Sequence, residues 1–381
     1  MKFQVNRDVL SEAVSFAVKL LPARTTLPIL SGVLIEATSE GLVLSSFDYE
    51  VSTQTKISAT IESEGRALVS GRLLSEIANR LPNAPVTFET IDSRIHVRCG
   101  QANFTLLSMP VDEYPTIPQV EGETGVIPAE DFAAAVAQVA VAASRDDVTP
   151  VITGVQLEIS GTNLSMIATD RYRVAIRDIP WESRNGDGDI AALVPARTIQ
   201  EIGKTFGHGG NISISITSKD DRELIAFTAD NKTVTSLLIK GNFPPVKRLF
   251  PETVENYAVV STSDLIEATR RVKLVVEREA ALRFTFENNS LTLEAIGGEQ
   301  AQASETIDAA ITGPAQVVVS LKPDFLLDGL GAVHSEFTRI AFTSVDNPGK
   351  PGPVLITSQT SKESNSENPY RYLLQPNLLL R

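Results

Sequence analysis

The sequence has one cysteine, few aromatic residues and no long hydrophobic run. Cys99 stands alone among 381 residues, so the chain cannot form an internal disulfide or a cysteine-rich zinc or iron–sulfur site. Aromatic residues make up 6%, which disfavours a platform for stacking bases. The longest small-apolar stretch, 132–143, is too short to span a bilayer, and the first eight residues turn polar too early for a signal peptide. We therefore expect a cytoplasmic protein without a membrane segment.

The motifs of common enzyme active sites are also missing. The sequence contains no GxxxxGK[ST], GxSxG or HExxH pattern, and the glycine-rich run 207–210 precedes an expected strand instead of opening a helix. Metal-ligand spacing is not evident either. His96, His208 and His334 are therefore interpreted as ordinary histidines. Asp146, Asp147 and Asp170 are interpreted as a solvated loop and a turn-capping aspartate. We expect no catalysis, no metal and no other cofactor.

The overall charge and length constrain what remains. The formal net charge is −13, so the whole-molecule field repels polyanions, and a nucleic-acid role would need a local basic face. The apolar share of 42% and charged share of 21% are typical of globular proteins. A chain of this length is expected to form two to four domains.

Two helical patterns each recur three times along the chain. The first is an i, i+3, i+4, i+7 apolar stripe that begins at Leu10, again at Phe132, and again at Leu265. The second begins at Leu74, Ile199 and Leu326. The offsets between copies lie between 122 and 133 residues, so two separate helices repeat with nearly one period.

Alternating strand patterns repeat with the helices. One strand surrounds residues 42–44, 164–166 and 291–293 in the three copies. A strand pair follows each second helix, at 85–90 with 95–99, 212–217 with 224–229, and 337–343 with 354–358. Short turns between strands favour antiparallel sheets with helices on one face, an α+β fold of three tandem repeats. Proline-containing linkers place the boundaries at 1–120, 121–251 and 252–381.

Five segments of the chain, in order along essentially its whole length, form a recognisable set: Met1-Lys2-Phe3, TLPILSGVLI at 26–35, ATDRYRVA at 168–175, the run 243–251, and YLLQP at 372–376. Together they resemble the bacterial DNA polymerase III beta subunit family, the sliding clamps. The resemblance implies a DNA clamp fold that dimerises into a six-domain ring, with helices inside and sheets outside. It also implies a non-catalytic processivity factor for DNA replication.

The resemblance further implies three kinds of contact. The first is sequence-independent binding of double-stranded DNA by Arg24, Arg72 and Arg197. The second is a homodimer contact between Phe104 and Leu106 of one copy and Leu274 of the other. The third is a pocket for short linear peptides of the replicative polymerase, the clamp loader and repair proteins. Its residues are Ile152, Thr169, Tyr172, Arg173, Val174, Pro244, Arg248, Leu249, Leu374 and Pro376.

Each of these assignments has a plainer structural alternative. The arginines could be solvated surface residues, and the apolar residues could be ordinary core. The family tail often carries methionine around the proline and ends in Arg-Leu, whereas this chain ends in QPNLLLR, so its peptide preference can differ. Pro150 and Val151 stand where some relatives have aromatic residues.

The expected helices are slightly less acidic than the remainder of the chain. Taken as residues 6–21, 70–80, 128–144, 195–206, 261–279 and 322–333, they carry 11 basic and 12 acidic residues, which is −1, and leave −12 of the total −13 for all other residues. A second function class remains open at this point, namely a three-domain α+β protein that binds a nucleotide or a glycan. The molecular mass in solution would distinguish a homodimeric ring from a monomeric binding protein.

Overall fold

The structure is a computed structural model that describes residues 1–22, 25, 27–184, 186, 188–219, 222–277, 280–295, 301–344, 351–361 and 369–377. The chain forms two compact units. The first unit comprises residues 1–130, 182–186 and 204–238, and the second comprises 131–181, 187–203 and 239–381. No helix in the described ranges is long and apolar enough to cross a membrane.

Six α-helices lie in the described part of the chain. They are α1 (Arg7–Val18), α2 (Gly71–Ala78), α3 (Ala129–Val139), α4 (Ala196–Phe206), α5 (Thr262–Val272) and α6 (Pro323–Gly331). The six residues that begin the repeated stripes all occupy the fourth position of their helices, and all are at most 1% exposed. The repeat predicted from sequence is therefore confirmed in position and burial.

Local chemistry fixes several helix starts. The Asn6 side chain accepts hydrogen bonds from the backbone N–H groups of Asp8 and Val9. Ser70 and Ser261 accept one each from Leu73 and Asp264. Such caps satisfy N–H groups that have no partner within the helix.

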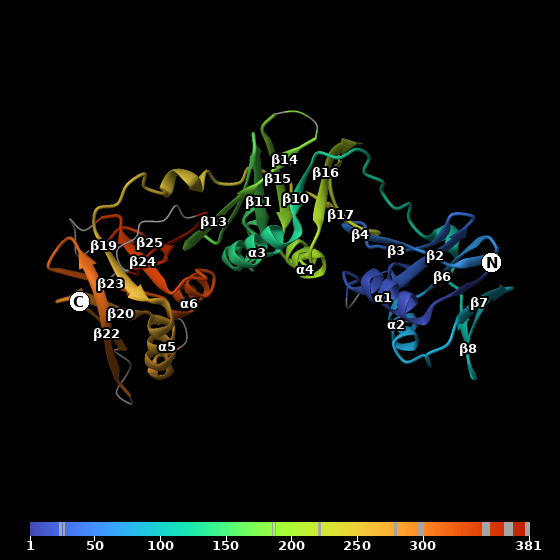
Figure 1. The fold of residues 1–381 in the computed structure, drawn as a ribbon, viewed down its shortest axis with the longest axis horizontal. Helices are drawn as coiled ribbons and strands as arrows, with labels where there is room; N and C mark the ends of the chain where they lie inside the picture. The colour runs from blue at the N-terminus through green and yellow to red at the C-terminus, as the bar shows by residue number, and fades with distance from the viewer. Residues whose placement is uncertain are drawn as a thin grey trace. The chain divides into compact units, whose positions relative to one another are not determined.

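Helix α1 packs against α2, and helix α5 packs against α6. In Figure 1, α1 and α2 lie side by side in blue, and α5 and α6 lie side by side in orange. α3 and α5 end earlier than the sequence pattern suggested, because 3-10 turns at Ala140–Ala142 and Lys273–Val275 continue them. A 3-10 turn tightens the backbone and ends the regular stripe.

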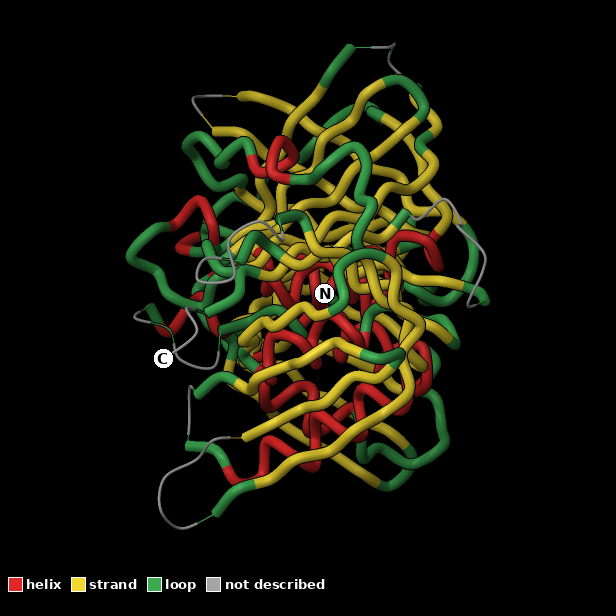
Figure 2. Tube along the Cα trace, turned by 90° about the vertical axis from the view of Figure 1, so that its left-hand side faces the viewer, coloured by secondary structure: helices red, strands yellow, loops and turns green. Residues whose placement is uncertain are grey.

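Strands make up most of the regular structure, drawn in yellow in Figure 2. In the first unit, one sheet has the order β5-β1-β7-β8-β9 and another has the order β14-β10-β16-β17-β18-β4-β3-β2-β6. Their bounds are β1 Lys2–Val5, β2 Gly32–Thr38, β3 Gly41–Phe47, β4 Val51–Ile57, β5 Thr60–Ser63, β6 Gly65–Ser70, β7 Val86–Ile91, β8 Arg94–Cys99, β9 Ala102–Leu107, β10 Gly125–Pro128, β14 Glu182–Ser183, β16 Asn211–Lys219, β17 Arg222–Ala229 and β18 Lys232–Leu237.

The second unit has one long sheet with the order β15-β11-β12-β13-β26-β25-β24-β19-β22-β21-β20-β23. Its bounds are β11 Gly154–Ser160, β12 Asn163–Thr169, β13 Arg173–Pro180, β15 Ile190–Pro195, β19 Tyr257–Ser261, β20 Leu282–Glu287, β21 Ser290–Ala295, β22 Ala303–Thr312, β23 Gln316–Leu321, β24 Phe337–Phe342, β25 Val354–Gln359 and β26 Tyr370–Leu374. All pairings are antiparallel, as the short turns predicted.

Sequence repeats are joined edge to edge by these sheets. In the first unit β18 pairs with β4, and in the second unit β26 pairs with β13. We call these pairs the first joint and the second joint. Each joint brings the last strand of one predicted repeat against an edge strand of the preceding one.

Candidate functional site

The turn between β12 and β13 presents polar and aromatic groups at the second joint. Asp170 Oδ1 accepts hydrogen bonds from the backbone N–H groups of Tyr172 and Arg173, at 3.0 and 3.1 Å. Asp170 is therefore the turn-capping aspartate that the sequence suggested. Arg171 adopts a φ of +79°, a left-handed conformation that costs a non-glycine residue energy and that is favoured at tight turns.

Arg173 is buried and is held by three protein side chains. Its guanidinium pairs with Asp170 at 2.9 Å and with Asp328 of α6 at 2.6 Å, and its Nη1 donates to the Tyr372 hydroxyl at 3.2 Å. The guanidinium also lies 4.2 Å from the centre of the Phe325 ring. Burial alone would lower the pKa of Arg173, but Tyr372, Asp328 and Asp170 outweigh it and raise that pKa above its ordinary value.

An aromatic pair flanks this ion cluster. Tyr172 is 58% exposed, and its ring centre lies 6.2 Å from that of Phe325. Lys322 places its ammonium 5.7 Å from the Tyr172 ring and 5.2 Å from the Phe325 ring. Such distances allow cation–π attraction, which orients the two rings.

A cavity of about 810 Å³ opens beside this cluster, within the second unit. Three of the predicted pocket residues line it: Ile152, Tyr172 and Arg173. The rest of the lining is Ala143, Ser144, Arg145, Asp146, Thr149, Asp170, Arg171, Lys322, Asp324, Phe325, Leu327 and Asp328. The cavity thus combines aromatic walls with ion-paired polar groups, as sites for specific ligands commonly do.

The other predicted pocket residues are divided by strand alternation. Arg173 lies opposite Leu374 and faces α6, whereas Val174 lies opposite Leu373 on the other face of the sheet. We call these the helix side and the linker side. Thr169 pairs with Val174 on the linker side, and its hydroxyl donates to the Arg173 carbonyl at 2.7 Å.

An apolar cluster covers the linker side of the second joint. Val174, Ile167, Ile176 and Leu373 pack with Val246, which belongs to the 3-10 turn Val246–Leu249. In the same stretch Leu249 is 51% exposed, Arg248 is exposed and Pro244 is half-buried. The ten predicted residues therefore gather around one joint but do not line a single cavity.

The tail is part of the joint itself. Leu374 is 0% exposed and pairs with both Arg173 and Val354. The Gln375 N–H donates to the Tyr172 carbonyl at 2.8 Å, and Pro376 is buried. Leu374 is thus a core residue of β26, and the chain stays bonded as far as Asn377, whose N–H donates to the Ser320 carbonyl at 2.8 Å.

Sequence reasoning missed the residues that α6 contributes. Lys322, Phe325 and Asp328 come from the third repeat and lie more than 140 residues from the turn they contact. The only local signal was that Lys322 and Phe325 stand four and one positions before the buried Leu326 of α6. That pattern alone does not indicate a partner.

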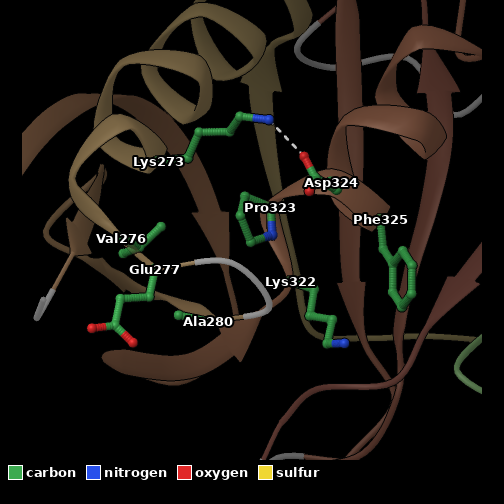
Figure 3. Close-up of a pocket in the computed structure, with 8 residues that line it drawn as sticks. All are labelled: Lys273, Val276, Glu277, Ala280, Lys322, Pro323, Asp324 and Phe325. Carbon is green, nitrogen blue, oxygen red and sulfur yellow. Dashed lines mark hydrogen bonds and ion pairs between the residues drawn. The ribbon is translucent and has the colours of Figure 1, made fainter.

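A smaller cavity of about 270 Å³ adjoins the start of α6. Figure 3 shows Lys273 reaching toward Asp324, an ion pair of 2.6 Å, with Pro323 between the two chain segments. Lys322 and Phe325 line this cavity as well as the larger one. In the described residues no cluster of three or more His, Cys, Asp or Glu side chains is placed to hold a metal ion.

Comparisons with known proteins agree with this architecture. Three family models, for the N-terminal, central and C-terminal domains of the DNA polymerase III beta subunit, match residues 1–118, 126–245 and 247–363. The chain belongs to the DNA polymerase III beta subunit family. Its function is that of a sliding clamp in DNA replication, and the nucleotide- or glycan-binding alternative has no support.

Curated relatives match nearly all of the chain. It is 42% identical over 377 residues to the beta sliding clamp of Streptomyces coelicolor, covering 99% of each chain. It is 28% identical over 366 residues to that of Bacillus subtilis, covering 91% and 94%. The solved sliding clamp of Bacillus subtilis matches with a TM-score of 0.91 at 26% identity over 100% of both chains.

Two of the three predicted DNA contacts lie at helix starts. Arg72 and Arg197 are exposed, and each is the second residue of its helix, α2 and α4. The corresponding residue of α6 is Asp324. Arg72 pairs with Glu76 at 3.2 Å, and Arg24 lies outside the described residues.

The predicted dimer residues of the beta subunit differ in exposure. Phe104 on β9 is 37% exposed and Leu274 is 79% exposed, whereas Leu106 is 5% exposed and belongs to the core of the first unit. Leu107, which the sequence did not single out, is 72% exposed beside it.

Proposed function

We propose that two copies of this chain close head to tail into a ring around duplex DNA. The ring would be completed by β9 of one copy pairing with β22 of the other. The observation that carries this proposal is the pattern of the two joints inside the chain.

Equivalent strands of the repeats are used at both joints. The order β7-β8-β9 corresponds to β16-β17-β18 and to β24-β25-β26, and the order β2-β3-β4 corresponds to β11-β12-β13 and to β20-β21-β22. β18 pairs with β4 and β26 pairs with β13, so β9 and β22 are the pair left to join. Within the described residues β9 pairs only with β8, and residues 303–308 of β22 pair only with β21.

Open strand edges of this kind need a partner or protection. Mutual pairing of a β9 edge with a β22 edge from a second copy satisfies both edges twice in a closed dimer. The exposed Phe104, Leu107 and Leu274 supply apolar surface for that contact. The repeat boundaries at 1–120, 121–251 and 252–381 are part of the same proposal.

Charge substitution on β9 tests the dimer. Leu107→Asp should convert the dimer to a monomer in sedimentation or light scattering, because a desolvated carboxylate opposes strand pairing. Ile91→Asp is the matched control, since Ile91 is 46% exposed on the same sheet but lies on β7, away from the edge. A Leu107→Asp protein that keeps the wild-type mass would contradict the β9 contact.

We propose that Arg72 and Arg197, together with Arg24, contact DNA through phosphates only. A clamp must hold DNA without a preferred base register, and phosphate contacts carry no sequence information. The chain is proposed to act in the cytoplasm and without catalysis, as a tether for other replication proteins.

We propose that the second joint docks linear peptides from the replicative polymerase, the clamp loader and repair proteins. Two large apolar side chains, Tyr172 and Leu249, are about half exposed near the end of the β13–β26 pair, and the tail at Gln375–Pro376 lies against Tyr172. Two or three apolar anchors, each worth about 1.5–3 kcal/mol before association entropy, give affinity near micromolar.

Truncation separates the tail's role in docking from its role in folding. A chain ending at Leu374 should bind a polymerase-derived peptide at least tenfold more weakly in calorimetry, because the wall at Pro376 is gone. A chain ending at Asn377 is the control and should bind like wild type. Equal affinity of all three proteins would place the peptide elsewhere.

A further inference from the structure

A polar cavity of about 280 Å³ lies at the first joint, under the linker that follows the first repeat. Its floor is formed by strands β4, β18, β17 and β16, and its roof by linker residues 117–122. We call it the hydroxyl cavity. The polar side chains of its floor are Ser52, Gln54, Ser213, Ser215, Thr228, Thr233 and Thr235.

Strand register explains why so many hydroxyls converge there. One row across the four strands reads Ser52, Thr235, Ala226, Ser215, and the adjacent row reads Gln54, Thr233, Thr228, Ser213. Directly paired residues share a face of the sheet. Seven of these eight positions are polar, so the two rows form a continuous hydrogen-bonding surface.

Two hydroxyls of this surface have no partner among the described protein groups. Ser52 is 3% exposed and Thr235 is 5% exposed, and neither hydroxyl makes a hydrogen bond within the described part of the chain. Thr228 and Thr233 bond each other at 3.0 Å, and Ser215 donates to the Gly122 carbonyl at 2.5 Å. Both residues line the cavity, so their hydroxyls are free to bond a ligand held there.

The equivalent positions at the second joint carry apolar side chains. Ser52 and Thr235 are paired across the first joint as Val174 and Leu373 are across the second. Ser52 and Val174 are each the second residue of their strands. There the linker seals an apolar cluster, whereas at the first joint it covers hydroxyls.

The walls specify the chemistry of the occupant. Ile117, Pro118 and Val120 form an apolar roof opposite the hydroxyl floor. A sugar ring has the matching character, with C–H groups on one face and hydroxyls at its edges. Lys56 lines the cavity, is exposed and pairs with no carboxylate among the described residues, and no Asp or Glu lines the cavity. A phosphate on the sugar would meet that ammonium.

We propose that the hydroxyl cavity binds a small phosphorylated sugar. The volume is close to the lower end of small-molecule sites. This site is separate from peptide docking at the second joint, so either proposal can fail without the other.

Ligand-observed NMR and calorimetry on the full chain test the site, with ribose 5-phosphate, ribose and inorganic phosphate as probes. Ribose 5-phosphate should bind with a Kd in about the millimolar range or below, and at least tenfold more tightly than either fragment. The double variant Ser52→Ala/Thr235→Val should lose at least tenfold in affinity. Lys56→Met should remove the preference for ribose 5-phosphate over ribose.

Matched variants keep the test decisive. Thr235→Ser retains a hydroxyl and should bind like wild type, and Leu249→Ala alters only the second joint and should leave ribose 5-phosphate binding unchanged. Absence of binding to wild type at about 10 mM would overturn the proposal. So would equal affinity for inorganic phosphate and ribose 5-phosphate, or equal binding by wild type and the folded double variant.

Discussion

Arg173 illustrates how one residue can hold a site together without being its contact surface. The sequence-based resemblance placed it in a peptide pocket, yet its Nε and Nη1 atoms are bonded to Asp170, Asp328 and Tyr372. It therefore links the turn before β13 to α6 and β26. Tyr172, with most of its ring exposed, is better placed to meet a ligand.

Removing this guanidinium should destabilise the fold. Arg173→Met leaves the nearly buried Asp170 without its counter-charge, and the expected loss is about 2–4 kcal/mol in the free energy of unfolding by urea. Arg72→Met is the control, because its side chain is 91% exposed and its pair with Glu76 is worth about 0.5 kcal/mol or less. Equal stability of the two variants would show that the ion cluster contributes nothing.

Tyr114 gives a pH dependence with a defined sign. Burial raises the pKa of Tyr114 from 10.0 to about 12. The neutral phenol is therefore favoured by folding, so its contribution is fully present below pH 10 and is lost as the pH rises toward 12.

Wild type should lose stability more steeply than Tyr114→Phe above pH 10, in urea unfolding series at matched ionic strength. Below that pH the two proteins should differ little, because the Tyr114 hydroxyl lies 3.5 Å from its acceptor. Parallel curves through the alkaline range would mean that the phenol ionises equally well in the folded chain.

At the scale of elements, helix α6 must come very close to strand β26. A Cβ atom placed on Gly329 would lie 2.6 Å from the Tyr372 ring, whereas one on Gly331 meets nothing within 4 Å. The glycine at 329 thus lets Tyr372 lie against the helix and donate its hydroxyl proton to the Phe325 carbonyl at 2.7 Å.

The two glycines should respond in opposite directions to alanine. Gly329→Ala should lower the free energy of unfolding by about 1–3 kcal/mol through overpacking. Gly331→Ala should be neutral or stabilising by up to about 1 kcal/mol, because alanine favours helix. Thermal or urea unfolding measures both, and a neutral Gly329→Ala would mean that α6 can shift away from β26.

The helices and most strands were predictable because their causes are local. Apolar residues spaced at i, i+3 and i+4 place Leu10, Phe132 and Leu265 on one buried face in each repeat. Pairings between distant segments were not predictable in the same way. Asp328 meets Arg173 across 155 residues, and nothing in either local pattern names the other.

The division of the predicted pocket between two faces of the sheet has the same origin. Val174 and Arg173 are neighbours in sequence, but in a strand neighbouring side chains point to opposite faces. The role of Leu374 as a core residue likewise depends on β25 and β13 on either side of it. A truncation that removes Leu374 would therefore break two strand pairings, whereas one that begins after it leaves both in place.

At the scale of the whole molecule, an acidic protein must hold an acidic polymer. A net charge of −13 makes strong direct binding to DNA unfavourable. A closed ring removes the need for it, since encirclement holds DNA while a few phosphate contacts orient it. Direct binding should be weak and salt-sensitive, whereas topological retention should be neither.

The most direct test compares the loaded protein on nicked circular DNA with the same complex after one restriction cut. At a salt concentration that abolishes binding to short linear duplex, the protein should stay on the circle through gel filtration and leave within minutes of linearisation. Arg72→Ala/Arg197→Ala should weaken direct binding to duplex yet remain on the circle once loaded. Equal loss from circle and cut DNA would contradict a clamp that holds DNA by encircling it.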